Sequence, residues 1–550
     1  MPADSQNPGA RATHLVTNQP PALVRYNLYD RDIVLRRAVR REGAEWAEEQ
    51  LSRFGACLGG EEAIRWGFEA NENAPCLRTH DRFGNRRDEV EFHPAWHELL
   101  RLSISNGLHS APWADPCSSA HVARAAMMLL AGQNEAGHTC PVSMTYASVA
   151  ALRKQPELAK EWEPRILSRV YDRRFAPSTE KGGVLIGMGM TEKQGGSDVR
   201  ANTTTAAPAG NGEYRLTGHK WFCSAPMSDA FLVLAQAPGG LSCFLLPRWT
   251  PDGELNHISI QRLKNKLGNR SNASSEVEFE SAWAWRIGAE GCGVRGIIEM
   301  VNHTRLDCVL GSAALMRQAC FQAIHHAAYR SAFGKLLRDQ PAMQNVLADL
   351  ALESEAATIL AMRLARAFDE REKNSSAREF ARLATAVSKY WVTKRGPSHV
   401  AEALECLGGN GYVEESILPR LYREAPLNSI WEGSGNVNAL DILRAIGKDP
   451  KSLDSVLQEA ALAKGADRRF DTYLDELTTT LRQDLTEAGA RRIAERLALV
   501  LQASLLIRHS PPEVADAFCV SRLGGDWGRT AGTLPAGLDF RGIIQRAYEP

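Results

Sequence analysis

No apolar run in this 550-residue sequence approaches the roughly 20 residues that a membrane-spanning helix needs. The opening segment, MPADSQNPGARATHLVTNQPP, also lacks the apolar core of a signal peptide. The 65 basic and 65 acidic residues cancel, so the overall charge indicates no nucleic acid, membrane or acidic partner. These absences predict a cytoplasmic protein that does not associate with membranes. Its 44% apolar and 24% charged residues are typical of a globular protein.

The eleven cysteines are an odd number spread along the chain, and no two stand in a C-x-x-C spacing. Such a distribution is not that of a disulfide framework or a zinc ribbon. His93 and His97 in H-P-A-W-H would share one face of a helix. However, Pro94 stands where zinc proteases with this spacing carry a glutamate, and no third ligand is evident. We therefore expect no metal site and interpret both histidines as structural.

The spacing of apolar residues changes twice along the chain, which is long enough for several folding units. Between residues 30 and 178 the spacing is mostly helical, with loops expected at 71–75 and 111–119. After the glycine pair at 182–183 it becomes that of short strands separated by Asn-Gly, Gly-Gly and Pro-Asp-Gly turns. The expected strands span residues 213–217, 230–237, 241–246, 257–261 and 275–279.

From about residue 293 the pattern is helical again, and four long helices are expected at 311–333, 343–368, 380–391 and 436–446. Two further helical stripes follow at 470–485 and 493–505. The sequence thus predicts an α+β multidomain fold. Its expected parts are a flexible N-terminal arm (1–22), an N-terminal helical domain (23–183), a middle antiparallel β-barrel or sandwich (184–290), a C-terminal four-helix bundle (291–450) and an extra C-terminal helical domain (451–550).

A glycine-rich segment, G-M-T-E-K-Q-G-G-S-D at 189–198, follows a strand-like apolar run at the entrance of the β region. Its adjacent Gly195 and Gly196 let backbone N–H groups approach a ligand closely, and Thr191 and Ser197 place hydroxyl groups on either side. This composition suits an anion or the edge of a ring. The alternative is a tight turn in which the Ser-Asp pair caps a neighbouring element.

The glycine-rich segment resembles the first signature of the acyl-CoA dehydrogenases, and three further matches follow in the family's order. They are R-x-x-F-G-K at 330–335, E-x-x-G-G-x-G-Y at 405–412 and I-W-E-G-S-G-N at 430–436. The E-A-G-H-T-C-P element at 135–141 and the extra unit at 451–550 are similar to the AidB-like subgroup, which is associated with the adaptive response to DNA alkylation. The resemblance implies the acyl-CoA dehydrogenase fold for most of the chain.

The resemblance also implies FAD bound between the β domain and the bundle, whereas the absence of G-x-G-x-x-G after a strand argues against a Rossmann nucleotide site. Phe222, Cys223 and Ser224 are expected along the isoalloxazine, with the Ser224 hydroxyl near flavin N5. The implied cofactor-binding residues are Met188, Gly189, Met190, Thr191, Gly195, Gly196, Ser197, Phe222, Cys223, Ser224, Arg330, Trp431, Gly433, Ser434 and Asn436.

Arg330 is expected to bind the FAD pyrophosphate of a neighbouring subunit, because a guanidinium can hold that anion with two donors. A site shared in this way implies an oligomer, a homotetramer if the chain follows the family. The alternative for Arg330 is an ordinary solvated helix residue.

Glu432 is the expected catalytic base. Removing the α-proton of a thioester requires a carboxylate over that carbon, while a hydride leaves the β-carbon for the flavin. In the family the thioester oxygen is held by the backbone N–H at the position of Glu432 and by a flavin hydroxyl. Without the resemblance, Glu432 is an acid in a glycine-rich turn.

Two departures from the family leave the acyl substrate open: Trp431 stands where many members have tyrosine, and Asn302 where acyl-CoA users often carry aspartate. The first hypothesis is an FAD-dependent acyl-CoA dehydrogenase that passes electrons to an electron-transfer flavoprotein. The alternative is a flavin-carrying, double-stranded-DNA-binding protective protein with weak or vestigial dehydrogenase activity. DNA would bind at 451–550, whose 13 basic and 14 acidic residues give no net basic charge.

Overall fold

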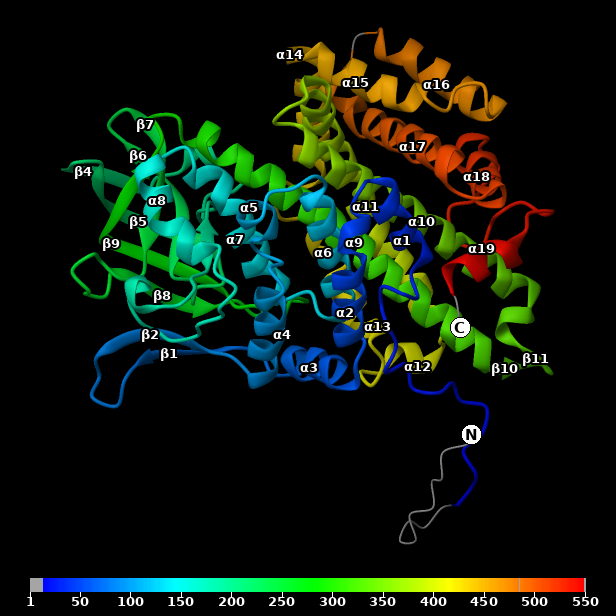
Figure 1. Cartoon of the computed structure of the whole chain (residues 1–550), viewed down its shortest axis with the longest axis horizontal. Coiled ribbons are helices and arrows are strands. Elements are labelled where there is room, and N and C mark those ends of the chain that lie inside the picture. Colours follow the sequence, from blue (N-terminus) through cyan, green and yellow to red (C-terminus); the bar gives the residue numbers. More distant parts are fainter. Residues whose placement is uncertain (1–12, 484, 549–550) are drawn as a thin grey trace.

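The computed structural model describes residues 13–483 and 485–548, and it consists of a helical body with a β domain at one end (Figure 1). The chain starts with helices that pack between these two parts. The helices that precede the β domain are α1 (Ile33–Arg41), α2 (Glu48–Leu58), α3 (Glu61–Glu72), α4 (Pro94–Ser105), α5 (Ala111–Ala114), α6 (Ala120–Asn134), α7 (Thr139–Leu152) and α8 (Pro156–Ile166).

The N-terminal arm is bound to the helical body from Asn18 onward. Its side chain exchanges two hydrogen bonds with the backbone of Ser331, at 2.7 and 2.9 Å, and its carbonyl accepts one from Arg330 at 2.7 Å. The Pro21 carbonyl lies 2.9 Å from a ring nitrogen of His325. The expectation of a flexible arm over 1–22 is therefore wrong for residues 18–22, and residues 1–12 lie outside the described part.

Between α3 and α4 the chain forms a hairpin where a helical domain with a loop was expected. Its strands are β1 (Cys76–His80) and β2 (Arg86–Glu91). The sequence of β2, R-R-D-E-V-E, is mostly charged, so it does not show the alternation of apolar and polar residues that predicts a strand. Val90 packs in the core of the β domain, and Asp88 accepts a hydrogen bond from the Ile260 N–H at 2.9 Å. The hairpin thus packs with the β domain, although it lies in the helical part of the sequence.

The β domain is a seven-stranded sheet, with the order β3-β5-β4-β6-β7-β9-β8 and additional pairings β3–β6 and β5–β9 that curl it into a barrel. Its strands are β3 (Ile186–Gly189), β4 (Thr205–Gly210), β5 (Glu213–Ser224), β6 (Ala230–Ala237), β7 (Gly240–Pro247), β8 (Ile258–Leu263) and β9 (Ser274–Ile287). The expected barrel is confirmed, but it is not purely antiparallel, because β3 and β4 both run parallel to β6. β4 was missed because T-A-A-P-A-G has weak strand propensity.

Four long helices form the bundle, as expected. They are α9 (Gly293–Tyr329), α10 (Pro341–Glu370), α11 (Ser375–Glu405) and α14 (Gly435–Lys448), and α9 packs against α6, α7, α10 and α11. Helix α9 starts well before residue 311, because its polar stretch is buried through ion pairs: Asp307 pairs with Arg124, and Arg305 with Asp441 at 2.8 Å. Short elements complete this region: β10 (Ser331–Ala332), β11 (Lys335–Leu336), α12 (Gly409–Tyr412) and α13 (Leu418–Glu424).

The C-terminal helices pack directly on the bundle (Figure 1). They are α15 (Pro450–Ala461), α16 (Arg468–Leu481), α17 (Ala490–His509), α18 (Pro512–Phe518) and α19 (Phe540–Ala547). Phe470, Leu501 and Phe518 belong to the same apolar cluster as the bundle. A buried ion pair reinforces this contact: Arg522 binds Asp349 and, at 2.9 Å, Glu353 of α10. No helix in the described ranges is long and apolar enough to cross a membrane.

Replacing Arg522 by methionine should destabilise this contact strongly. The side chains of Arg522 and Asp349 are each only 1% exposed, so the substitution leaves a buried carboxylate without its cation. Breaking such a pair costs about 3–5 kcal/mol. Urea unfolding should show the loss in Arg522→Met and almost none in Lys464→Met, which breaks an exposed pair with Asp475. Equal unfolding midpoints for both variants would contradict this assignment.

Candidate active site

Two loops that are distant in sequence border one apolar cluster, to which residues of α7 and α9 also belong. Met188, at the end of β3, and Met190, in the glycine-rich loop that follows, pack against this cluster, and Trp431 reaches it from the loop before α14. The structure therefore brings together the two segments that were expected to bind the flavin.

The glycine-rich loop folds back on itself as a tight hairpin. Glu192 and Gly195 exchange backbone hydrogen bonds of 3.0 and 3.2 Å. A Cβ atom at Gly196 would lie 2.5 Å from the Thr191 hydroxyl oxygen, so a side chain at this position requires the loop to shift. The following residue, Ser197, is exposed. Residues 193–198 of this loop are exposed, so their backbone is accessible to a ligand.

A buried ion pair that sequence reasoning missed anchors this loop. The Glu192 carboxylate and the Lys220 ammonium are 2.6 Å apart and both fully buried, and Lys220 also donates to the Leu234 carbonyl at 2.7 Å. Although burial opposes ionisation, hydrogen bonds from Lys220 and the Thr203 N–H hold the pKa of Glu192 at about 2. No short-range spacing links the two residues of the pair, so only the fold reveals it.

The end of β5 presents alternate side chains to the outside of the β domain. Phe222 is 46% exposed and Ser224 is half-buried, whereas Cys223 between them is buried in the β core. Successive residues of a strand face opposite sides of the sheet. The Cys223 side chain therefore faces the core, so of the three residues expected along the isoalloxazine Cys223 offers only its backbone to a flavin. The Ser224 hydroxyl lies 3.4 Å from that of Ser274.

The loop before α14 places Glu432 in a left-handed backbone conformation, with φ of 56°. Its carboxylate accepts a hydrogen bond from the Thr304 hydroxyl at 2.7 Å. Burial raises the pKa of Glu432 above the ordinary carboxyl value, against the opposing effects of Thr304, Lys389 and Arg305. The carboxyl group is thus in an environment that increases its proton affinity, as a general base requires.

The neighbours of Glu432 in this loop have structural contacts of their own. The Trp431 indole N–H donates to Asn428 at 3.1 Å, and Ser434 is the N-cap residue of α14. Gly433 has φ of 95°, a conformation that favours glycine. Asn436 accepts a hydrogen bond at 2.8 Å from Arg491, so the C-terminal domain reaches the edge of this site.

Arg330 lies far from Glu432 within the chain. It follows the last turn of α9, whereas Thr304 lies near the start, and the helical rise of about 1.5 Å per residue separates them by roughly 39 Å. Its guanidinium instead donates to the Asn18 carbonyl. Arg330 can therefore meet the flavin site only across a contact between two subunits.

Both histidines of the H-P-A-W-H segment form hydrogen bonds within the chain. The His93 ring accepts a hydrogen bond from the Ala95 N–H at the start of α4, and the His97 ring lies 2.7 Å from the Tyr171 hydroxyl.

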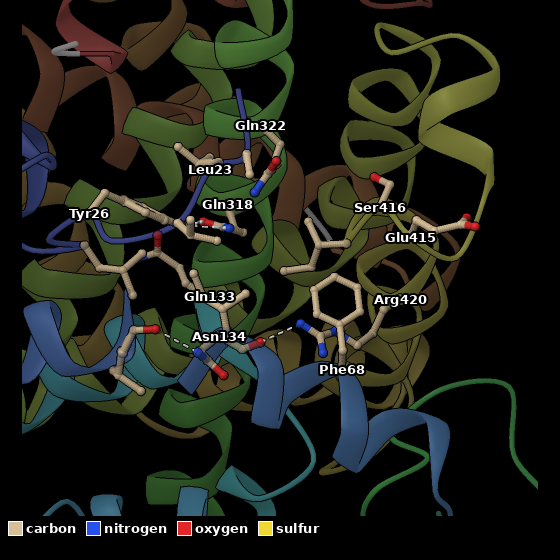
Figure 2. Close-up of a pocket in the computed structure, with 16 residues that line it drawn as sticks. Leu23, Tyr26, Phe68, Gln133, Asn134, Gln318, Gln322, Glu415, Ser416 and Arg420 are labelled. Atoms are coloured by element: carbon tan, nitrogen blue, oxygen red, sulfur yellow. Dashed lines mark hydrogen bonds between the residues drawn. The ribbon is translucent and has the colours of Figure 1, made fainter. Parts of the chain in front are cut away.

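A separate cavity of about 210 Å³ lies between the N-terminal segment, α3, the end of α6, α9 and the loop before α13 (Figure 2). Arg420 donates to the Asn134 carbonyl at 2.8 Å on one side, and Tyr26 and Gln318 are hydrogen-bonded on the other. None of the expected flavin-binding residues lines it, so this cavity is distinct from the site around Glu432.

Comparison with known protein families assigns three consecutive parts of the chain. Residues 18–173 match the N-terminal domain of the adaptive response protein AidB, 187–282 the acyl-CoA dehydrogenase middle domain, and 291–447 the acyl-CoA dehydrogenase C-terminal domain. The sequence is 49% identical to the AidB protein of Escherichia coli over 92% of this chain and 94% of that one. The chain belongs to the acyl-CoA dehydrogenase family.

Similarity to other acyl-CoA dehydrogenases extends over nearly the whole length. Acyl-CoA dehydrogenase family member 11 of Caenorhabditis elegans is 31% identical over 90% of this chain and 87% of its own. A crystal structure of the ACDH-11 protein of that organism in complex with C11-CoA superposes with a TM-score of 0.85, at 29% identity and 94% coverage of both chains. Butyryl-CoA dehydrogenase from Megasphaera elsdenii, at 19% identity and a TM-score of 0.57, shares the fold.

The family consists of FAD-dependent oxidoreductases, and the residues present fit this cofactor. Residues 193–198 of the glycine-rich loop are exposed, and a glycine at 196 lets Thr191 pack against the backbone so that the loop stays flat enough for a polar group to approach. The exposed ring of Phe222 beside Ser224 offers a flat apolar surface of the kind that an aromatic heterocycle covers. The glycine-rich loop and the end of β5 would hold the cofactor.

Substituting Gly196 by alanine should reduce the FAD content of the purified protein at least tenfold. The added Cβ would lie 2.5 Å from Thr191 and displace the loop. The matched control is Gly447→Ala, where a Cβ meets nothing within 4 Å in the last turn of α14. The ratio of flavin to protein absorbance measures the result. Full FAD content in Gly196→Ala would show that the loop does not bind the cofactor.

Proposed function

We propose that this chain oxidises an acyl-CoA with Glu432 as the base that removes the α-proton of the thioester. When bound, FAD supplies the acceptor for the hydride that leaves the β-carbon. The observation that carries the proposal is the state of the Glu432 carboxylate, which accepts a hydrogen bond from the neutral Thr304 hydroxyl and forms no ion pair among the described residues. A buried carboxylate that forms no ion pair is suited to accept a proton.

The backbone around Glu432 supports the same chemistry. As the α-proton leaves, negative charge develops on the thioester oxygen and requires hydrogen-bond donors. Within the described ranges, the Glu432 N–H donates to no protein acceptor, so it is available for this oxygen. The carboxylate and the N–H of one residue would then act on adjacent atoms of the substrate.

The substrate class follows from the family, and a C. elegans relative was crystallised with C11-CoA. Trp431 is half-buried, and its indole N–H is hydrogen-bonded to Asn428. Its side chain beside the base is larger than the tyrosine that many family members have at this position. We therefore include medium, short and branched acyl chains among the candidate substrates. The electron acceptor is a flavoprotein of the electron-transfer type.

The first experiment mixes the FAD-loaded protein anaerobically with acyl-CoAs of these classes and follows the loss of flavin absorbance. The wild type should bleach with at least one thioester, and Glu432→Gln should slow bleaching by at least a thousandfold, because it removes the proton acceptor but keeps the size of the side chain. A fully flavinated wild type that no thioester bleaches would refute the proposed function.

The bleaching rate should rise with pH through a midpoint above 4.5, the ordinary glutamate pKa. Burial raises the pKa of Glu432, so its carboxyl group stays protonated, and unable to accept a proton, to a higher pH than an exposed glutamate. Stopped-flow measurements across the pH range test this. A midpoint at or below 4.5 would mean that the carboxylate is solvated when substrate binds.

The cofactor site is shared between subunits of a homotetramer. Two observations support this: Arg330 lies at the far end of α9, and Phe333 beside it is 98% exposed although it is a large apolar residue. Arg330→Glu should lose FAD, because the charge would repel the pyrophosphate, while Arg338→Glu in the same region should keep it. Sedimentation of a monomer that retains stoichiometric FAD would refute the sharing.

DNA association, the alternative function, has weaker support in this chain. Several basic residues of the C-terminal domain pair with acidic neighbours: Lys464 with Asp475, Arg469 with Asp467 and Asp516, and Arg496 with Glu476. Titration of the holoprotein with duplex DNA at increasing salt tests it. Binding that weakens steeply with salt, and is lost in Arg468→Ala/Arg492→Ala, would favour this function.

A further inference from the structure

The loop that carries Glu432 is held by two cations through three successive backbone carbonyls. The Lys389 ammonium, on α11, donates to the carbonyls of Trp431, at 2.8 Å, and Gly433. The Arg305 Nε–H, on α9, donates to the Glu432 carbonyl between them at 3.1 Å. Each carbonyl from 431 to 433 therefore accepts a hydrogen bond from a positive charge, which fixes the left-handed turn from both sides.

A second donor of Arg305, its Nη1 group, is directed to Asp441 on α14 rather than to the base. Arg305 Nη1 lies 2.8 Å from Asp441 Oδ2, and Arg382 binds the other carboxylate oxygen at 2.9 Å. Although burial opposes ionisation, Arg305 and Arg382 hold the pKa of Asp441 below its ordinary value. Asp441 is thus a charged counter-ion that keeps one guanidinium oriented along the loop.

This arrangement explains how Glu432 remains a strong base beside two cations. A lysine or arginine that paired with its carboxylate would stabilise the charged form and lower its proton affinity. Here the donors of Lys389 bind carbonyls, and Arg305 divides its donors between a carbonyl and Asp441. The groups that face Glu432 are Thr304, Arg305 and Cys308 on α9, Lys389 on α11 and Cys140 on α7.

We propose that Lys389 and Asp441 are positioning residues for the base: Lys389 locks the turn that aims the Glu432 carboxylate, and Asp441 keeps Arg305 from pairing with it. This inference rests on the proposed function of Glu432. A merely structural role for these residues would change stability and flavin content but would not change the proton affinity of Glu432 in a defined direction.

The experiment compares Asp441→Asn, Asp441→Glu, Lys389→Met and Lys389→Arg with the exposed control Lys448→Met at the end of α14. Infrared difference spectra between each variant and the same variant carrying Glu432→Gln report the titration of the Glu432 carboxyl group without any substrate. Asp441→Asn releases Arg305 and should weaken the proton affinity of Glu432 about tenfold, whereas Asp441→Glu should restore it. Lys448→Met should titrate like the wild type.

Lys389→Met should raise the proton affinity of Glu432 but lower the rate of flavin bleaching. Loss of the ammonium removes a nearby positive charge, so the proton affinity of Glu432 should rise. The unlocked turn should nevertheless slow flavin bleaching at least tenfold at unchanged FAD content, since misplacement of a reacting group by about 1 Å is enough for such losses. Lys389→Arg, which keeps the charge and the donors, should recover part of the rate.

The outcomes separate this inference from the proposed function. A wild type that bleaches with no thioester refutes the function of Glu432, while the infrared titration still decides whether Asp441 controls its proton affinity. An unchanged titration in Asp441→Asn, in a variant that binds FAD normally, overturns the role of Asp441. Wild-type bleaching by Lys389→Met overturns the role of Lys389.

Discussion

The left-handed turn at Glu432 and Gly433 is the constraint on which the site depends. A glutamate with φ of 56° is in a sparsely populated conformation that costs about 1–3 kcal/mol and persists only where its surroundings enforce it. Here they do so through Lys389 on α11 and Arg305 on α9, which bind the carbonyls on and beside this residue. The bundle therefore serves the chemistry directly, because two of its helices converge on one turn of the chain.

Helix α9 connects Glu432 to distant parts of the chain. Its early part supplies Thr304 and Arg305, its flank packs against α6 and α7, and its end carries Arg330 into the hairpin that binds the N-terminal segment. A single helix of this length cannot place both ends at one flavin. If subunits pack against one another, the two ends of α9 can contribute to the flavin sites of two different subunits. This would explain why the family motifs at 330–335 and 430–436 lie far apart within one chain.

Much of the fold could be predicted because its signals are local. The helical stripes of α10 and α17 are periodic, and the turn between β6 and β7 carries a glycine pair, so these elements appear close to their expected positions, whereas α11 extends well beyond the expected 380–391. The helical spacing was evident from about residue 293, but the long helix was placed only from residue 311, because Asp307 and Arg305 look like a polar interruption until Arg124 and Asp441 are known to pair with them. Strand β2 was missed for a similar reason, because most of its residues are charged.

The candidate site shows the same difference between local motifs, which the sequence reveals, and long-range contacts, which it does not. The glycine-rich loop and Glu432 were proposed as site residues from motifs that resemble those of the family. The ion pair of Glu192 with Lys220 and the contacts of Lys389 join residues with no sequence relationship, so no spacing could indicate them. The side of the strand on which Cys223 lies also became clear only from the pairing of β5 with its neighbours.

The most direct test of this account is the exchange of the substrate α-hydrogens with solvent. The FAD-loaded protein is incubated anaerobically in D₂O with an acyl-CoA whose β-carbon cannot release hydride, and mass spectrometry follows deuterium at the α-carbon. The account predicts rapid exchange by the wild type and none by Glu432→Gln, because proton removal needs only the carboxylate and its turn. Equal exchange by both proteins would show that another group removes the proton and would contradict the assignment of Glu432.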